Sequence, residues 1–218
     1  MRAIFIIILT FLSVMHTSAQ QKTMTYLALG DSYTIGESVP VYENFPYQLV
    51  QKMRQKNKPV HAPELVARTG WTTGELMAGI ARTQLLNTYD LVTLLIGVNN
   101  QYRGRSTEEY AKEFEWLLKL AIEKAGGKAS NVVVVSIPDW GATPFAKDRD
   151  RAKITREIDA FNAINREISA RYQTRYADIT EASRDARSMP ELVAADGLHP
   201  SGLEYTKWMN AIWKALGW

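Results

Sequence analysis

The sequence predicts an α/β fold in which helices cover both faces of a parallel β-sheet. Short apolar runs alternate along the chain with longer segments whose apolar residues have helical spacing. The runs Leu91–Ile96 and Val132–Ile137 are continuous and rich in Val, Ile and Leu, which is typical of strands buried on both faces. Strand–helix alternation of this kind implies right-handed crossovers, and these connect parallel strands.

Five apolar runs are the predicted strands, in chain order Tyr26–Leu29, Leu65–Ala67, Leu91–Ile96, Val132–Ile137 and Tyr176–Ile179. Three stripes at helical spacing predict helices that pack one face on the core. These stripes run from Tyr110 to Ile122, closed by Gly126 and Gly127, from Ile154 to Tyr172, and from Tyr205 to Leu216. We interpret them as core faces and not as cofactor-binding segments.

The first nineteen residues differ from the rest of the chain. Arg2 precedes an apolar run over residues 3–12, and Thr17 and Ala19 place small residues at positions −3 and −1 of a cleavage site. This pattern predicts a secretory signal peptide over 1–19 and an exported protein, secreted or periplasmic. The alternative is a membrane anchor, but the run is shorter than the roughly 20 residues of a spanning helix. We expect no stable membrane anchor after cleavage.

Composition narrows the remaining possibilities. The chain has no cysteine, which excludes disulfides, a lipid anchor on cysteine and a thiolate nucleophile. The formal net charge is +3, and the basic stretches 52–58 and 147–156 are interleaved with acids or glutamines, so nucleic-acid binding is not expected. No linker or repeat follows the signal, so residues 20–218 are predicted to form one domain; the oligomeric state stays open.

Residues of chemical interest follow every predicted strand. They are Ser32, Gly70, Asn99, Trp140 and the pair Asp196 and His199, in chain order. The carboxyl ends of parallel strands meet at one edge of a sheet, where ligand sites of open α/β folds lie. We therefore expect these side chains to gather at that edge.

Ser32 is the candidate nucleophile. A serine hydroxyl needs a neighbouring base, while its own backbone N–H at the start of a helix is a donor toward an oxyanion. Gly30 permits the sharp turn between strand and helix. The alternative is a helix N-cap serine without catalytic role. The second glycine of a G-x-S-x-G elbow is replaced by Thr34, and Ile35 excludes an S-x-x-K motif.

His199 is the candidate base. His16 lies in the signal peptide and His61 in a proline-bounded segment, so His199 remains by elimination. Asp196 lies three residues earlier, where its carboxylate reaches Nδ1 and leaves Nε2 for Ser32. The alternative is a surface turn, since Asp-Gly and His-Pro are common in turns. The sequence contains no H-E-x-x-H motif and too few histidines for a zinc cluster, so no metal is expected.

The oxyanion needs further donors. The side-chain amide of Asn99 and the backbone N–H of Gly70 are candidates beside the N–H of Ser32. Both residues also tolerate positive φ, so loop structure alone is the alternative explanation.

The chain resembles the SGNH hydrolase superfamily, also called GDSL esterases and lipases. The resemblance rests on four blocks in order: Gly30-Asp31-Ser32 with Gly36, then Gly70, then Gly97-x-Asn99, and Asp196-x-x-His199-Pro200. It implies a three-layer, flavodoxin-like fold with a five-stranded parallel sheet. It also implies Ser32, His199 and Asp196 as the catalytic triad, and Ser32, Gly70 and Asn99 as the oxyanion hole. Asn100 departs from the usual Asp, which puts the local loop geometry in question, and Gly74 is an alternative to Gly70.

These residues lead to a hypothesis of ester hydrolysis through an acyl-serine intermediate, without metal or organic cofactor. Trp71, Trp140 and Phe145 are candidate substrate contacts, although they would equally pack the loops. The chain has no long apolar insertion to form a lid, which favours short-acyl or soluble substrates over triglycerides. Lysophospholipids and acylated glycans both stay open. The alternatives are a carbohydrate O-acetylesterase, an acyltransferase, and a non-catalytic glycan-binding module on the same scaffold.

Overall fold

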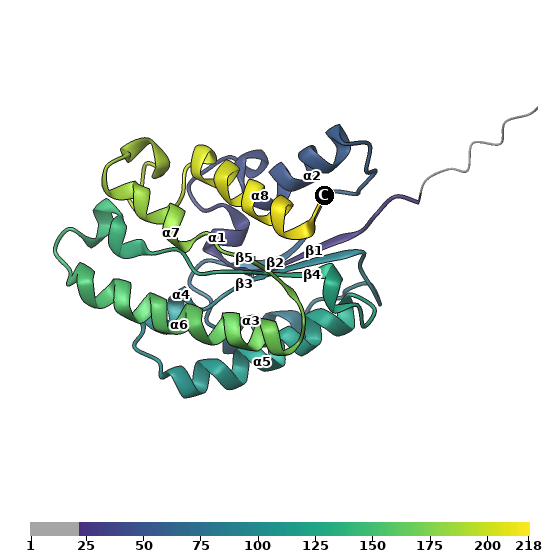
Figure 1. The fold of residues 1–218 in the computed structure, drawn as a ribbon, viewed down its shortest axis with the longest axis horizontal. Coiled ribbons are helices and arrows are strands. Elements are labelled where there is room, and N and C mark those ends of the chain that lie inside the picture. The colour runs from purple at the N-terminus through teal and green to yellow at the C-terminus, as the bar shows by residue number, and fades with distance from the viewer. Residues whose placement is uncertain (1–21) are drawn as a thin grey trace, which may run out of the picture.

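A five-stranded parallel sheet forms the middle layer of the protein (Figure 1). The computed structural model describes residues 22–218, so the expected signal peptide lies outside the described residues. The strands are β1 (Tyr26–Asp31), β2 (Glu64–Arg68), β3 (Leu91–Leu95), β4 (Val132–Val135) and β5 (Arg175–Ala177). Their order across the sheet is β2-β1-β3-β4-β5, and every neighbouring pair is parallel. The predicted parallel sheet is thus confirmed.

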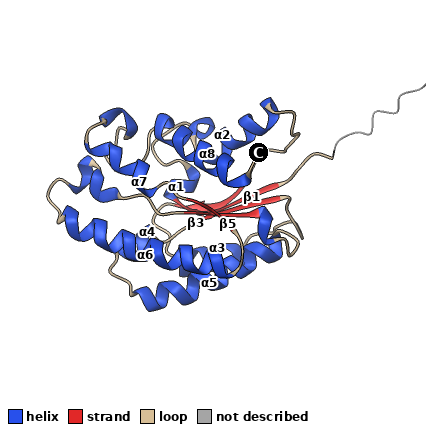
Figure 2. Ribbon diagram, viewed as in Figure 1, coloured by secondary structure: helices blue, strands red, loops and turns tan. Residues whose placement is uncertain are grey.

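Helices cover both faces of this sheet (Figure 2). Figure 1 shows α2 (Phe45–Gln55) and α8 (Gly202–Leu216) on one face, and α3 (Thr73–Ala81), α5 (Thr107–Lys124) and α6 (Arg151–Arg171) on the other. The short helices α1 (Ser32–Ile35), α4 (Val98–Tyr102) and α7 (Thr180–Ser183) follow β1, β3 and β5. They therefore lie at the carboxyl edge of the sheet. Among residues 22–218, no helix has both the length and the apolarity to cross a bilayer.

The three predicted amphipathic stripes are the helices α5, α6 and α8. A side chain of Ser106, Asp150 or Ser201 accepts a backbone N–H in the first turn of each one. After α5, Gly126 and Gly127 both adopt positive φ, of 66° and 78°, which a residue with a side chain adopts only at a cost. The sequence pattern therefore defined both the buried face and the end of the helix correctly.

The strand β3 ends at Leu95, just before the predicted Ile96, whereas β4 and β5 end clearly earlier than predicted because side chains replace the ladder hydrogen bonds. The backbone N–H of Ile137 donates to Asn162 Oδ1 at 2.8 Å, so β4 ends at Val135. The N–H of Ile179 donates to the hydroxyl of Ser136 at 2.8 Å, so β5 ends at Ala177. The side chains of Asn162 and Ser136 thus satisfy these backbone N–H groups where the two strands end, at the carboxyl edge of the sheet.

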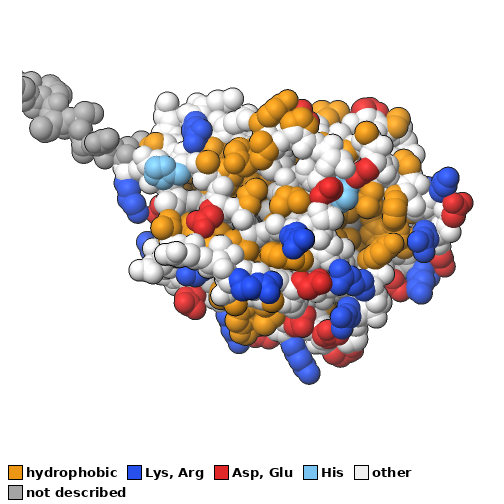
Figure 3. All heavy atoms as spheres, turned by 180° about the vertical axis from the view of Figure 1, so that it is seen from behind, with side chains coloured by type: hydrophobic (Ala, Val, Ile, Leu, Met, Phe, Trp, Pro, Cys, Tyr) orange, Lys and Arg blue, Asp and Glu red, His pale blue; other side chains and the backbone are white. Residues whose placement is uncertain are grey.

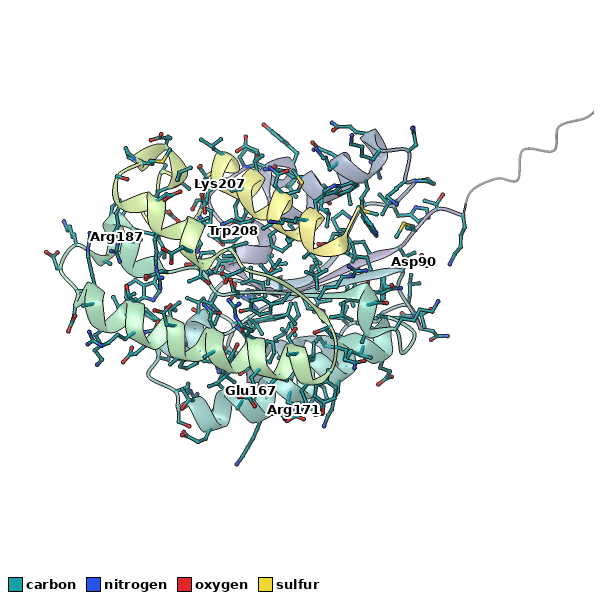
Figure 4. All side chains as sticks on the ribbon, in the orientation of Figure 1. Asp90, Glu167, Arg171, Arg187, Lys207 and Trp208 are labelled. Carbon is teal, nitrogen blue, oxygen red and sulfur yellow. The ribbon has the colours of Figure 1, made fainter. Side chains whose placement is uncertain are left out.

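The side chain of Trp208 fixes α8 against the sheet. Figure 4 shows it between α8 and the strands, and it is fully buried. Its Nε1–H donates to Glu204 Oε1 at 2.8 Å, and its ring contacts Tyr33, the residue after Ser32, with centroids 5.8 Å apart. The final helix is thus packed directly against the helix that begins at Ser32.

Candidate active site

Most of the expected site residues line one cavity of about 210 Å³ at the carboxyl edge of the sheet. Its lining is Ser32, Tyr33, Thr69, Gly70, Val98, Asn99, Tyr102, Trp140, Phe145, Leu198 and His199. On the face seen in Figure 3, hydrophobic side chains gather next to a histidine at the end of the molecule opposite the grey trace. A larger hollow of about 560 Å³ lies along α6 and contains none of the expected residues.

Ser32 begins α1 in a turn that its neighbours hold tightly. Oδ1 of Asp31 caps the helix by accepting the N–H of Tyr33 at 3.0 Å. Gly36 ends the helix with φ of 78°, and its N–H returns to the carbonyl of Ser32. A side chain at Gly30 would collide with the side chain of Thr34 and the carbonyl of Leu95. Gly30, Asp31 and Gly36 therefore shape the turn that presents Ser32.

A short hydrogen bond of 2.5 Å joins Nδ1 of His199 to Oδ2 of Asp196. Oδ1 of Asp196 accepts the N–H groups of Leu198 and His199 at 2.9 and 3.0 Å. The carboxylate thus closes the turn and contacts the ring at the same time. A proton on Nδ1 leaves Nε2 as the basic nitrogen.

The pKa of Asp196 lies well below its ordinary value. Burial raises this pKa, but hydrogen bonds from the His199 ring, the Ser38 hydroxyl and the two backbone N–H groups outweigh burial. Asp196 is therefore ionised at neutral pH, and its carboxylate accepts a hydrogen bond from Nδ1–H while the proton stays on the ring. Within the described chain, no hydrogen bond joins the Ser32 hydroxyl to the His199 ring, although both line the cavity; such bonds often tighten only when substrate binds.

The helix α4 holds the loop of Gly70 in place. Asn99 Nδ2 donates to the carbonyl of Trp71 at 3.0 Å, and the Arg103 guanidinium donates to the carbonyl of Gly70 at 2.6 Å. Gly70 has φ of 81° and lines the cavity. Gly74 instead lies within α3, where an added Cβ would meet the Glu113 carboxylate at 3.3 Å. The structure therefore places Gly70, and not Gly74, at the cavity with Asn99.

Asn100, the departure from the usual block, has a defined partner. Its Oδ1 accepts the N–H of Thr73 at 3.0 Å, and its Nδ2 donates to the Thr73 hydroxyl at 2.6 Å. That hydroxyl in turn donates to the carboxylate of Glu113. Because the hydroxyl proton goes to Glu113, its oxygen needs a donor at position 100, which an amide provides and a carboxylate lacks. Asn100 and Glu113 are thus matched, and the loop geometry is maintained.

Two of the three expected substrate contacts lie at the cavity. Trp140 is buried, and its Nε1–H donates to Gln101 at 2.8 Å. The rings of Tyr102 and Phe145 meet Trp140 edge-on at 5.4 and 6.0 Å, and they are 49% and 42% exposed. One buried ring therefore supports two exposed rings at the rim.

Trp71 is placed elsewhere. Its ring lies against Gly79 on α3, where the absence of a side chain leaves room for the indole, and it is not part of the cavity lining. Its neighbour Gly70 faces the cavity, but the turn directs the indole into the packing between the loop and α3. The expected substrate contact at Trp71 is therefore corrected to a packing role.

Two aromatic residues of the site were missed by sequence reasoning. Tyr33 meets the His199 ring edge-on at 5.6 Å, and Tyr102 lines the rim. Helical spacing offered a signal for Tyr102, since it lies three residues after Asn99 and therefore on the same side of α4. Tyr33 had no such signal beyond its position next to Ser32.

A parallel sheet between two helical layers, with a serine and an aspartate–histidine pair at its carboxyl edge, is an arrangement found in serine hydrolases. The chain belongs to the GDSL-like lipase/acylhydrolase family, whose model matches residues 28–206. The resemblance drawn from the four blocks is thereby confirmed.

Solved structures share the fold. The chain is similar to TesA, with a TM-score of 0.69, 18% sequence identity and coverage of 88% of this chain and 97% of TesA. It is also similar to a lipase/acylhydrolase from Enterococcus faecalis, with a TM-score of 0.68, 20% identity and coverage of 89% of this chain and 96% of the other. A third similar structure is Axe2, an acetylxylan esterase from Geobacillus stearothermophilus, with a TM-score of 0.70, 16% identity and coverage of 89% of this chain and 94% of Axe2. At these identities the likeness shows a common fold. The comparison with curated proteins gives no match.

Residues 22–218 contain no group of three or more His, Asp or Glu side chains placed to bind a metal ion.

The capping carboxylate beside the nucleophile generates a prediction about stability. Burial raises the pKa of Asp31 to about 7, and its Oδ2 is buried without a hydrogen-bond partner. Between pH ~3.9, the ordinary value, and about 7, the folded state keeps a proton that the unfolded state loses, so the free energy of unfolding falls as pH rises. Asp31→Asn keeps the cap and removes this titration. We expect its advantage over the wild type in urea unfolding to be larger at pH 8 than at pH 4.

Asp90→Asn is the matched control with the opposite sign. Burial raises the pKa of Asp90, but hydrogen bonds from Thr25 and Lys22 lower it below its ordinary value. This variant should therefore lose stability relative to the wild type above pH ~4. If the free energies of unfolding of Asp31→Asn and the wild type differ by the same amount at pH 4 and pH 8, the raised pKa of the buried Asp31 carboxyl is contradicted.

Proposed function

We propose that the protein is a serine esterase that hydrolyses carboxylic esters through an acyl intermediate on Ser32. The observation that carries this proposal is the cavity that Ser32, His199, Gly70 and Asn99 line together, with Asp196 bonded to the His199 ring. Membership of an acylhydrolase family supports the reaction class. The sequence of residues 1–19 supports export of the enzyme through a cleaved signal peptide.

In the proposed mechanism, Ser32 Oγ attacks the acyl carbon while His199 Nε2 takes the hydroxyl proton. The carbonyl oxygen becomes an oxyanion, and the N–H groups of Ser32 and Gly70 and the amide of Asn99 stabilise it. His199 then returns the proton to the leaving alcohol, and the ester bond breaks to give the acyl-serine. Water attacks this intermediate with the same proton transfers, which releases the acid and restores Ser32.

The size of the cavity favours a short acyl group. Its volume of about 210 Å³ is below the roughly 300–1,000 Å³ of sites that enclose drug-sized ligands. Its apolar lining includes Val98, Leu198 and the ring of Trp140. A short chain would be enclosed, whereas the long chain of a lysophospholipid would have to extend over the rim. We therefore propose short-acyl esters as the preferred substrates, ahead of lysophospholipid-type esters.

A panel of p-nitrophenyl esters tests this proposal. The wild type should cleave acetyl and butyryl esters with higher kcat/KM than the decanoyl ester, because the longer chain exceeds the cavity. Ser32→Ala should reduce kcat by at least ~10³-fold on every ester, since the nucleophile is lost. The far-ultraviolet circular dichroism of the variant should match that of the wild type.

Hydrolysis that persists in Ser32→Ala would refute the nucleophile. An optimum at ten carbons with an intact Ser32 dependence would refute only the short-acyl preference and favour a lysophospholipid-type substrate.

A carbohydrate O-acetylesterase is the second candidate. The exposed rings of Tyr102 and Phe145 at the rim favour it, because aromatic faces are common platforms for sugar rings. One structure with the same fold is an acetylxylan esterase. In this version the acetyl group enters the cavity while the sugar rests on the rim.

Replacement of the rim aromatics separates the two candidates. Tyr102→Ala and Phe145→Ala should each raise KM for an acetylated xylo-oligosaccharide by about 3- to 10-fold, and leave KM for ethyl acetate within about 2-fold. Acetate release is the assay for both substrates. Trp116→Ala, which removes an exposed ring on α5 outside the cavity, is the control. Equal changes for both substrates would argue against a sugar platform.

A further inference from the structure

A serine outside the expected triad contacts the triad carboxylate. The hydroxyl of Ser38 donates to Asp196 Oδ2 at 2.7 Å, and Oδ2 is also the oxygen that binds the His199 ring. We propose that Ser38 is a positioning residue, which fixes the Asp196 carboxylate and through it the imidazole of His199 relative to Ser32. This inference rests on the proposed esterase function.

The four hydrogen bonds of the Asp196 carboxylate have unequal origins. Three come from its own turn, namely from the backbone N–H groups of Leu198 and His199 and from the His199 ring. The fourth comes from Ser38, which is 158 residues away in the chain. The local bonds tie Asp196 to His199. Among the hydrogen bonds that the carboxylate accepts within residues 22–218, the one from Ser38 is the one that reaches the end of the chain containing Ser32, and it adds to the packing of Tyr33 on the His199 ring.

The segment that carries Ser38 is itself anchored at the site. The N–H groups of Gly36 and Glu37 both donate to the carbonyl of Ser32 at 3.1 Å. The carboxylate of Glu37 accepts a hydrogen bond from Thr69, which lines the cavity beside Gly70. Ser38 is therefore held in a fixed relation to the nucleophile and to the loop of Gly70. A movement of Ser32 relative to the Asp196 turn would have to break the hydrogen bond between Ser38 and Asp196.

The backbone of Ser38 is strained. Its φ is 67°, in the left-handed region that disfavours residues with a side chain. Glycine would relieve this strain, but it has no hydroxyl. Strained backbone outside glycine persists where the surrounding structure holds it, and it is concentrated at functional sites. The hydrogen bond to Asp196 gives this strained position a function.

The effect of losing the hydroxyl should fall on turnover and not on substrate binding. Ser38 is absent from the cavity lining, so substrate should bind as before. The Asp196 side chain is 31% exposed, so without Ser38 its Oδ2 has water as an alternative partner and the carboxylate is free to rotate. The His199 ring then samples orientations that do not serve Ser32.

Three substitutions separate the hydroxyl from the backbone strain. Ser38→Gly removes the hydroxyl and relieves the strain, Ser38→Ala removes the hydroxyl alone, and Ser38→Thr keeps the hydroxyl and adds strain through its branched side chain. We expect Ser38→Gly and Ser38→Ala to lower kcat on p-nitrophenyl acetate by ~10-fold with KM unchanged. Ser38→Thr should retain kcat within ~3-fold. The Tm should be maintained or raised in Ser38→Gly and lowered in Ser38→Thr.

In Ser38→Gly, kcat is thus expected to fall while Tm is maintained or raised. In Ser38→Thr, Tm is expected to fall while kcat is retained. A Ser38→Gly variant with wild-type kcat, or a Ser38→Thr variant as slow as Ser38→Gly, would overturn the inference. So would a fall in kcat that follows Tm across the three variants, because it would show a structural role alone.

A measurement without turnover distinguishes this inference from the proposed function. Proton NMR of the His199 Nδ1–H at neutral pH reports its hydrogen bond to Asp196 Oδ2, the oxygen that also accepts the Ser38 hydroxyl. This resonance should move in Ser38→Gly and Ser38→Ala, but not in Ser38→Thr. An unchanged resonance in all three variants would refute the contact even if Ser32-dependent hydrolysis is found. Absence of that hydrolysis in the wild type, with the resonance moved as expected, would refute the catalytic purpose and the proposed function together while retaining the contact.

Discussion

The packing of Tyr33 between His199 and Trp208 brings the two ends of the chain into one site. Tyr33 directly follows Ser32, and its buried ring meets both other rings edge-on, at 5.6 and 5.8 Å. Trp208 fixes α8 on the sheet, and α8 begins just after the turn that contains His199. The base therefore reaches the nucleophile only when the final helix is packed. Burial of large aromatic rings, which is non-directional and strong, supplies this constraint, while hydrogen bonds set the finer geometry.

Those hydrogen bonds run between the loops more than within them. Asn99 and Asn100 of α4, together with its C-cap residue Arg103, hold the Gly70 loop and the start of α3. The segment after α1 bonds to both Thr69 and Asp196. The Gly70 loop and the Asp196 turn are thus each held by segments that are distant in the sequence. Such cross-connection keeps donors and nucleophile at fixed separations, which catalysis by preorganised groups requires. The rim differs, because the rings of Tyr102 and Phe145 are exposed and meet the buried ring of Trp140 edge-on. Hydrogen bonds between distant segments thus surround the residues of the proposed chemistry, whereas exposed aromatic rings line the rim.

The sequence was sufficient for the sheet, its helices and the gathering of Ser32, Gly70, Asn99 and His199 at one edge, because these depend on local patterns and on the topology of parallel strands. It was not sufficient where distant contacts decide. Trp71 faces the bare backbone of Gly79 and not the cavity. Asn100 replaces the usual Asp because the Thr73 proton is committed to Glu113. Ser38 had no signal at all, since neither its positive φ nor its contact with Asp196 is encoded in neighbouring residues.

Labelling with a fluorophosphonate tests the central claim most directly, because this reagent reacts with a serine only when a base activates it. The native protein should acquire one adduct, which peptide mapping assigns to Ser32. His199→Ala, with Ser32 still present, should slow the labelling by at least ~10²-fold. Labelling at another residue, or labelling of Ser32 at an unchanged rate in His199→Ala, would contradict a nucleophile and a base brought together from the two ends of the chain.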